Sequence, residues 1–196
     1  MGHYQQRQLQ AYADRVAASK VDITRHKCFI SYHAADVDQV TQFISDFGTE
    51  FIAKTIGVTD EDDFIDSEDS DYIMDRIRSK YLADSTVTIV LVGNCTWARR
   101  YVDWEVYSSL RSSKLSRVNG LLAVQLPGGG KLQARVEDNI ERDGNATDVG
   151  YARWYSYPGS KATLRGWISD AFNARTSRNH LINNSRPRRL SSAACP

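Results

Sequence analysis

The segment from Thr86 to Val92 constrains the fold most, because it is apolar along almost its whole length. A strand with one face in water alternates apolar and polar residues, whereas a strand buried on both faces reads as a continuous apolar run. We therefore predict a central strand here, in a sheet covered by helices on both faces.

Other strand and helix patterns alternate along the chain on both sides of this segment. Short apolar runs predict further strands over 27–32, 51–58, 118–126 and 151–157. Apolar residues at helical spacing predict helices over 36–48, 69–82, 97–114 and 161–174. The polar stretch 135–148 is assigned to neither. Such alternation is typical of a parallel sheet, so we predict a flavodoxin-like α/β fold, an open parallel sheet of about five strands flanked by helices on both faces.

Composition changes at both ends of the chain suggest three parts. Residues 1–24 carry apolar residues at helical spacing and predict an N-terminal helical extension. Residues 25–175 hold the alternating strands and helices of the α/β domain. Residues 176–196 are rich in arginine and contain two prolines, so we expect a basic, disordered tail.

The overall composition is that of an ordinary globular protein, with 41% hydrophobic residues and a net charge of +1. Nothing in it favours a nucleic-acid or membrane partner, and no apolar run is long enough to span a bilayer. The three cysteines show no CxxC spacing, which argues against a disulfide framework and a zinc site. We therefore expect a cytoplasmic protein without a bound metal.

The candidate site follows from the predicted sheet, because ligands of open parallel sheets bind outside the carboxyl ends of the strands. Ser31, Tyr32 and His33 follow the first strand, and the turn Gly93-Asn94-Cys95-Thr96 follows the central strand. In the next predicted helix, Trp97, Tyr101 and Glu105 are four residues apart and are expected to share one stripe. Glu105 is thus a carboxylate between aromatic rings at the cleft, although such a pattern also suits a surface glutamate beside core-filling rings.

The same region also suits other interpretations. Cys95 could act as a nucleophile with His33 as its base, since a helix N-terminus lowers the pKa of a thiol. A phosphoacceptor domain is rejected because acidic residues are missing after the first and third strands.

The acidic loop 60–71 lacks the spacing of an EF-hand, and we expect a solvated loop that contacts a partner or gates the cleft. Asp36 is expected to cap the helix that follows it, with Gln39 in capping-box position.

Two segments resemble the sequence boxes of TIR domains. The run Phe29-Ile30-Ser31-Tyr32, with Asp36 at the next helix start, resembles their first box. The run from Trp97 to Glu105 resembles their third box, with Tyr101-Val102 in place of a Trp-Cys pair and Glu105 at the position of the glutamate. The Arg-Arg-aromatic-Val-x-aromatic-Glu pattern resembles the TIR-like branch of bacterial Thoeris antiphage systems, over roughly residues 27–126.

This resemblance implies an enzyme that cleaves NAD at the nicotinamide–ribose bond, with NAD as substrate and no cofactor. It implies that Glu105 is the catalytic residue, while Ser31, Tyr32, His33, Asn94, Trp97 and Tyr101 are candidate substrate contacts. The product would be a cyclised or conjugated ADP-ribose that activates a partner effector, with a phage-derived trigger and homo-oligomerisation as possible further interactions. Because many TIR domains are scaffolds, a non-catalytic interaction protein is the alternative.

Overall fold

A single parallel sheet forms the centre of the computed structural model, which describes residues 2–18, 25–56, 67, 69–112, 117–140 and 149–195. Its strands are β1 (Lys27–Ser31), β2 (Ile52–Ile56), β3 (Val87–Val92), β4 (Gly120–Gln125) and β5 (Arg153–Tyr155). They lie in the order β2-β1-β3-β4-β5, and all neighbouring pairs are parallel. The chain order reverses between β1 and β3, as in flavodoxin-like sheets. The predicted α/β fold is confirmed.

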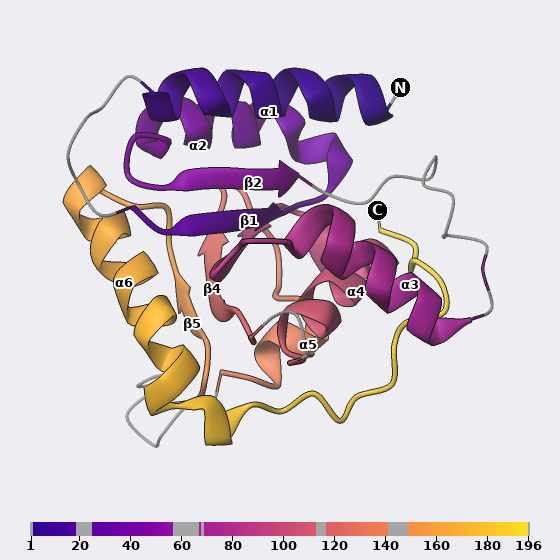
Figure 1. Cartoon of the computed structure of the whole chain (residues 1–196). Coiled ribbons are helices and arrows are strands. Elements are labelled where there is room, and N and C mark those ends of the chain that lie inside the picture. The colour runs from indigo at the N-terminus through magenta and orange to yellow at the C-terminus, as the bar shows by residue number, and fades with distance from the viewer. Residues whose placement is uncertain are drawn as a thin grey trace.

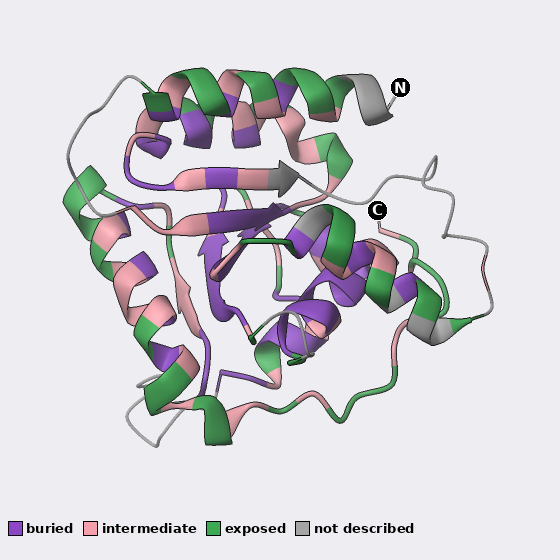
Figure 2. Cartoon of the chain, viewed as in Figure 1, coloured by how far each residue is buried: buried purple, intermediate pink, exposed green. Residues whose placement is uncertain are grey.

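Helices cover both faces of the sheet (Figure 1). They are α1 (Gly2–Ala18), α2 (Val37–Phe47), α3 (Ser70–Ile77), α4 (Arg100–Ser109), α5 (Ala134–Glu137) and α6 (Lys161–Ser177). Helices α1, α2 and α6 contribute to one core cluster, whereas α4 and α5 pack on the other face and α3 adds a smaller cluster beside α4. Figure 2 shows the buried residues along the sheet and on the helix faces turned toward it. Within the described ranges, no helix combines the length and apolar character needed to cross a bilayer.

Strand β3 explains why the sequence carries its longest apolar run here. All six of its residues are buried. Ile89 and Leu91 belong to the core shared with α2 and α6, whereas Val90 and Val92 belong to the core shared with α4 and α5. Because successive side chains of a strand point to opposite faces, burial on both faces favours apolar residues throughout, and the polar exception, Thr88, is hydrogen-bonded to Ser109 Oγ at 2.7 Å.

The N-terminal helix α1 packs against β2, the strand at one edge of the sheet. Leu9 and Ala13 are buried in the core cluster. The Gln10 side chain donates from Nε2 to the Ala53 carbonyl of β2 at 3.0 Å. A helix that covers an edge strand and bonds to its backbone shields polar groups that another chain could otherwise pair with.

Several predicted boundaries differ from those of the structure. The helix predicted over 97–114 is a 3-10 turn (Thr96–Ala98) followed by α4, because Arg99 is extended with φ −89° and ψ 125°. The helix predicted over 69–82 ends as α3 at Ile77 and continues as one π-helical turn. Part of the unassigned stretch 135–148 forms α5, while residues 141–148 lie outside the described residues, as do 60–66 and 68 of the acidic loop.

The expectation of a disordered C-terminal tail is wrong for the part that is described. Residues 183–195 run from below α6 along the α4 and α5 side to the edge of the sheet toward which the strands point (Figure 1). Their backbone and side chains make repeated hydrogen bonds with α4, α5 and the 3-10 turn before α4. The arginines that suggested solvated disorder instead make specific polar contacts.

Candidate functional site

Glu105 lies at the carboxyl end of β1, where the order of the strands reverses. It is on α4 and is only 1% exposed. Ser31, the last residue of β1, donates a hydrogen bond from Oγ to Glu105 Oε2 at 2.5 Å. A carboxylate that accepts a bond from a buried hydroxyl is held in one orientation, and here it is held at the edge where ligands of this fold bind.

The charge of the Glu105 carboxylate affects the pKa of Tyr32, the residue after Ser31. Burial raises the pKa of the Tyr32 phenol, and the negative charge of Glu105 raises it further. The phenol therefore stays protonated at neutral pH and is able to donate a hydrogen bond. Ser31 and Glu105 are thus hydrogen-bonded, and Tyr32 follows Ser31 in the chain; we call these three residues the glutamate centre.

A second polar group surrounds Asp36 at the start of α2. Thr96 Oγ1 accepts from the Gly93 amide at 2.9 Å and donates to Asp36 Oδ2 at 3.2 Å. Gly93 is required because a Cβ at this position would lie 2.1 Å from Asp36 Oδ2. Asp36 therefore bonds across the site to the turn after β3 and makes no side-chain cap of α2. The capping-box prediction is wrong, and Gln39 donates to the Pro127 carbonyl instead.

His33 and Arg99 lie beside Asp36. Burial lowers the pKa of His33, with a further lowering by the Arg99 charge and an opposing effect of Asp36. Burial also raises the pKa of Asp36, whereas His33, the Thr96 hydrogen bond and Arg99 oppose that rise. The charges of Asp36, His33 and Arg99 therefore influence one another, and Asp36 is bonded to Thr96 in the turn that follows β3.

The aromatic candidates are arranged differently from the prediction. Trp97 lies in the 3-10 turn and not in α4, so it does not share a helical stripe with Glu105. Its ring instead contacts Lys131, whose Nζ lies 3.8 Å from the ring centre. Tyr101 is in α4 and packs edge-on against Trp104 with ring centres 5.7 Å apart. The expected alignment is wrong for Trp97 because the extended Arg99 interrupts the helix, whereas Tyr101 and Glu105 are four residues apart within α4 as predicted.

Asn94 is exposed in the turn after β3, where Gly130 packs closely against its backbone carbonyl. The structure thus bonds Ser31 to Glu105, places His33 near Asp36, and carries Tyr101 in α4 with Glu105 and Trp97 in the turn that holds Thr96. Neither the bond of Asp36 across the site nor the contact of Lys131 with Trp97 was predicted from the sequence. Asp36 was assigned to a cap, and Lys131 lies beyond the matched boxes, where no motif marks it.

Cys95, in the same turn, forms a disulfide with Cys195, with their Cα atoms 5.7 Å apart. The expectation that the chain has no disulfide framework is therefore corrected by this bond. The thiol is not available as a nucleophile in this form, which removes the alternative based on Cys95 and His33. Cys28 is the remaining cysteine, and it is a free, fully buried thiol in β1.

Within the described part of the chain, no cluster of three or more His, Cys, Asp or Glu side chains is arranged to hold a metal ion. What the glutamate centre offers chemically is a fixed, buried negative charge next to hydroxyl donors. Such a group stabilises positive charge that develops on a bound substrate.

Comparison with known protein families gives a match. The family model described as Thoeris protein ThsB, TIR-like domain, matches residues 29–131, which is more than half of the chain. The match runs from within β1 to beyond β4 and contains α4, and so includes both polar groups described above. A search of curated proteins found no match.

Proposed function

The chain belongs to the TIR-like domain family of the Thoeris protein ThsB, and from this premise we propose that it cleaves NAD between nicotinamide and ribose. The observation that carries the proposal is the buried Glu105 carboxylate, oriented by Ser31 at the carboxyl end of β1. NAD is the substrate, and the reaction uses no further cofactor and no metal.

The chemistry requires little more than a well-placed negative charge. Nicotinamide is a cationic leaving group in NAD, so its departure needs no acid. As the bond breaks, positive charge develops on the ribose in an oxocarbenium-like transition state, as in glycoside hydrolysis. The Glu105 carboxylate stabilises that charge, and the Ser31 hydrogen bond keeps one of its oxygens in position.

The fate of the ribosyl group depends on what reaches its C1′ atom. Water gives ADP-ribose, whereas an adenine nitrogen or a second small molecule gives a cyclised or conjugated product when water is excluded. We assign the protein to antiphage signalling in the bacterial cytoplasm, where this product activates an effector protein. A phage component or self-association triggers the activity.

The experiment compares nicotinamide release from NAD by the wild type and by Glu105→Gln. Glutamine keeps the length of the side chain and an acceptor for Ser31 but removes the charge. We expect turnover to fall at least ~10²-fold, the scale of losing one electrostatic contact in a transition state. The matched control is Glu137→Gln, the same change at an exposed carboxylate on α5, and it should turn over NAD like the wild type.

Each variant is assayed with and without extract from phage-infected cells, so that a trigger is present. Mass spectrometry of the nucleotide products then identifies the product class. Equal turnover by Glu105→Gln and the wild type would reject the assignment.

A scaffold without catalysis is the second candidate, and one observation favours it. Glu105 is almost completely buried and hydrogen-bonded, as a structural carboxylate would be. On that reading Glu105→Gln lowers stability and the wild type releases no nicotinamide under any condition. The same assay, with thermal unfolding of both proteins, separates the two functions.

A further inference from the structure

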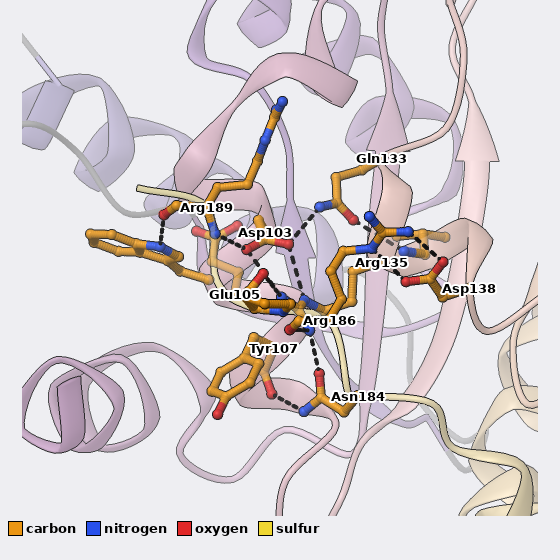
Figure 3. A network of polar contacts seen from close by, with 12 residues as sticks. Asp103, Glu105, Tyr107, Gln133, Arg135, Asp138, Asn184, Arg186 and Arg189 are labelled. Atoms are coloured by element: carbon orange, nitrogen blue, oxygen red, sulfur yellow. Dashed lines mark hydrogen bonds and ion pairs between the residues drawn. The ribbon is translucent and has the colours of Figure 1, made fainter. Parts of the chain in front are cut away.

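The C-terminal segment 183–195, here called the strap, is fixed to the domain near its start by a buried arginine. Arg135 of α5 is fully buried and pairs with Asp103 of α4, with 3.0 Å between Nε and Oδ1 and neither side chain exposed. The same guanidinium donates to three groups of the strap, which are Asn184 Oδ1 and the carbonyls of Arg186 and Pro187, at 2.8–3.0 Å. Figure 3 shows these contacts converging on Arg135.

Asp103 also holds the strap directly. Its Oδ2 accepts from the Arg189 amide at 2.9 Å, and its Oδ1 accepts from Gln133 at 2.7 Å. Removing residues 183–189 would therefore expose one member of a buried ion pair and leave several Arg135 donors without acceptors. Such a loss is strongly unfavourable, so we expect this part of the strap to stay docked.

The distal part, residues 190–195, is attached by weaker contacts. Ser192 Oγ accepts from the Arg100 amide at 3.2 Å, and the Ala193 amide donates to the Ala98 carbonyl at 2.8 Å. Leu190, the large apolar side chain here, is 88% exposed and so adds no hydrophobic anchor. Individual hydrogen bonds at a surface contribute little net stability.

One covalent bond completes the distal attachment. Cys195 is joined to Cys95, which lies in the turn after β3 beside the candidate contact Asn94. Both cysteines are partly exposed, so small thiols and disulfides can reach them. Disulfides in a reducing cytoplasm are usually transient and redox-sensing, whereas those of exported proteins persist.

We propose that Cys95 and Cys195 form a reversible redox modification site that fastens the distal strap across the rim of the candidate site. Oxidation uses a low-molecular-weight disulfide. One cysteine thiolate attacks this small disulfide, forms a mixed disulfide and expels one small thiolate. The second cysteine thiolate then attacks the protein sulfur of the mixed disulfide and expels the second small thiolate. The two protein sulfurs are oxidised, the small disulfide is reduced to two thiols, and the two cysteine protons end on them. A small dithiol reverses the exchange.

The expected effect of the disulfide on NAD binding rests on the proposed function. When the disulfide is formed, the Arg100 amide donates its hydrogen bond to Ser192 of the distal strap. The Arg100 guanidinium also donates to the Leu190 carbonyl at 3.5 Å. These donors, at the first residue of α4, are the kind that hold the phosphates of a dinucleotide. The oxidised form is therefore expected to bind NAD more weakly than the reduced form, while the glutamate centre is unchanged.

The test compares the oxidised and reduced full-length protein with Cys195→Ser under both conditions. Intact-mass analysis after alkylation should find two fast-reacting thiols after reduction and none after oxidation. Cys28 serves as the internal reference because burial raises the pKa of its thiol and makes it slow to react. Amide exchange of residues 190–195 should become about tenfold faster on reduction, while exchange of 183–189 stays unchanged.

NAD binding is measured by calorimetry on the Glu105→Gln background, so that affinity is obtained without turnover. We expect the oxidised form to bind NAD about fivefold to tenfold more weakly, the effect of roughly one hydrogen bond. In the Cys195→Ser background the oxidant should change neither exchange nor affinity.

Equal exchange of 190–195 in both redox states, or failure of the disulfide to form with a small disulfide oxidant, would overturn the proposed site. Equal NAD affinity in both states would overturn its effect on substrate. Absence of NAD binding in either state counts against the proposed function, whereas the exchange experiment still decides whether the disulfide fastens the strap.

Discussion

Replacing Arg135 by methionine is expected to destabilise the protein by about 3–5 kcal/mol, the usual cost of breaking a buried ion pair by removing one partner. Arg135 and Asp103 are both completely buried, and Arg135 also donates to three acceptors of the strap. Methionine fills much of the volume but satisfies none of these groups. The loss is a large share of the roughly 5–15 kcal/mol by which domains are stable.

The measurement is urea unfolding at pH 7 under reducing conditions, which removes any contribution of the disulfide. Arg186→Met is the matched control, because Arg186 pairs with Asp138 at the surface and its side chain is 44% exposed. The free energy of unfolding of this control variant should fall by less than about 1 kcal/mol. The double variant Arg135→Met/Asp103→Leu should lose less free energy of unfolding than the two single variants lose in sum. The reason is that no uncompensated buried charge remains in the double variant.

Two results would refute this reasoning. A loss below about 1 kcal/mol for Arg135→Met would mean that the pair behaves like an exposed one. Additive losses in the double variant would mean that the two side chains are not energetically coupled. Either result would also remove the reason to expect that residues 183–189 stay docked when the disulfide is reduced.

Two further predictions concern the group around Asp36. Gly93→Ala should cost about 1–3 kcal/mol in urea unfolding, because the new Cβ would overlap the Asp36 carboxylate; a change below about 0.5 kcal/mol would contradict the close approach. Burial and the Arg99 charge lower the pKa of His33 below 6.5 in the folded state, so its contribution to stability is present above pH 6.5 and is lost as the pH falls through the lowered pKa. NMR titration should find the His33 midpoint below 6.5, and Arg99→Gln should move it upward; a wild-type midpoint at or above 6.5 would contradict this.

The fold was largely predictable because its strongest signals are local. A six-residue segment that is apolar except for Thr88 fits a strand buried on both faces, and β3 is such a strand. Helical spacing located α2 and α6 for the same reason. The start of α4 was missed because Arg99 adopts an extended conformation, and no glycine or proline at that point signals the break.

The strap and its anchor were missed because they depend on contacts between distant residues. Arg135 looks like any surface arginine in the sequence, and only the fold brings it to Asp103 and residues 184–187. Likewise, Cys95 and Cys195 are 100 residues apart, so their spacing indicates nothing. The location of Glu105 near the carboxyl ends of the strands, in contrast, was predictable because its box follows the central strand directly.

The position of Glu105 relative to bound NAD is the central claim, and a structure of the Glu105→Gln variant with NAD measures it most directly. The account predicts that the substituted amide group lies about 3 Å from a hydroxyl of the nicotinamide ribose, within hydrogen-bond reach, with Ser31 still bonded to it. An NAD molecule bound elsewhere, with its ribose out of contact with residue 105 and the end of β1, would contradict the account.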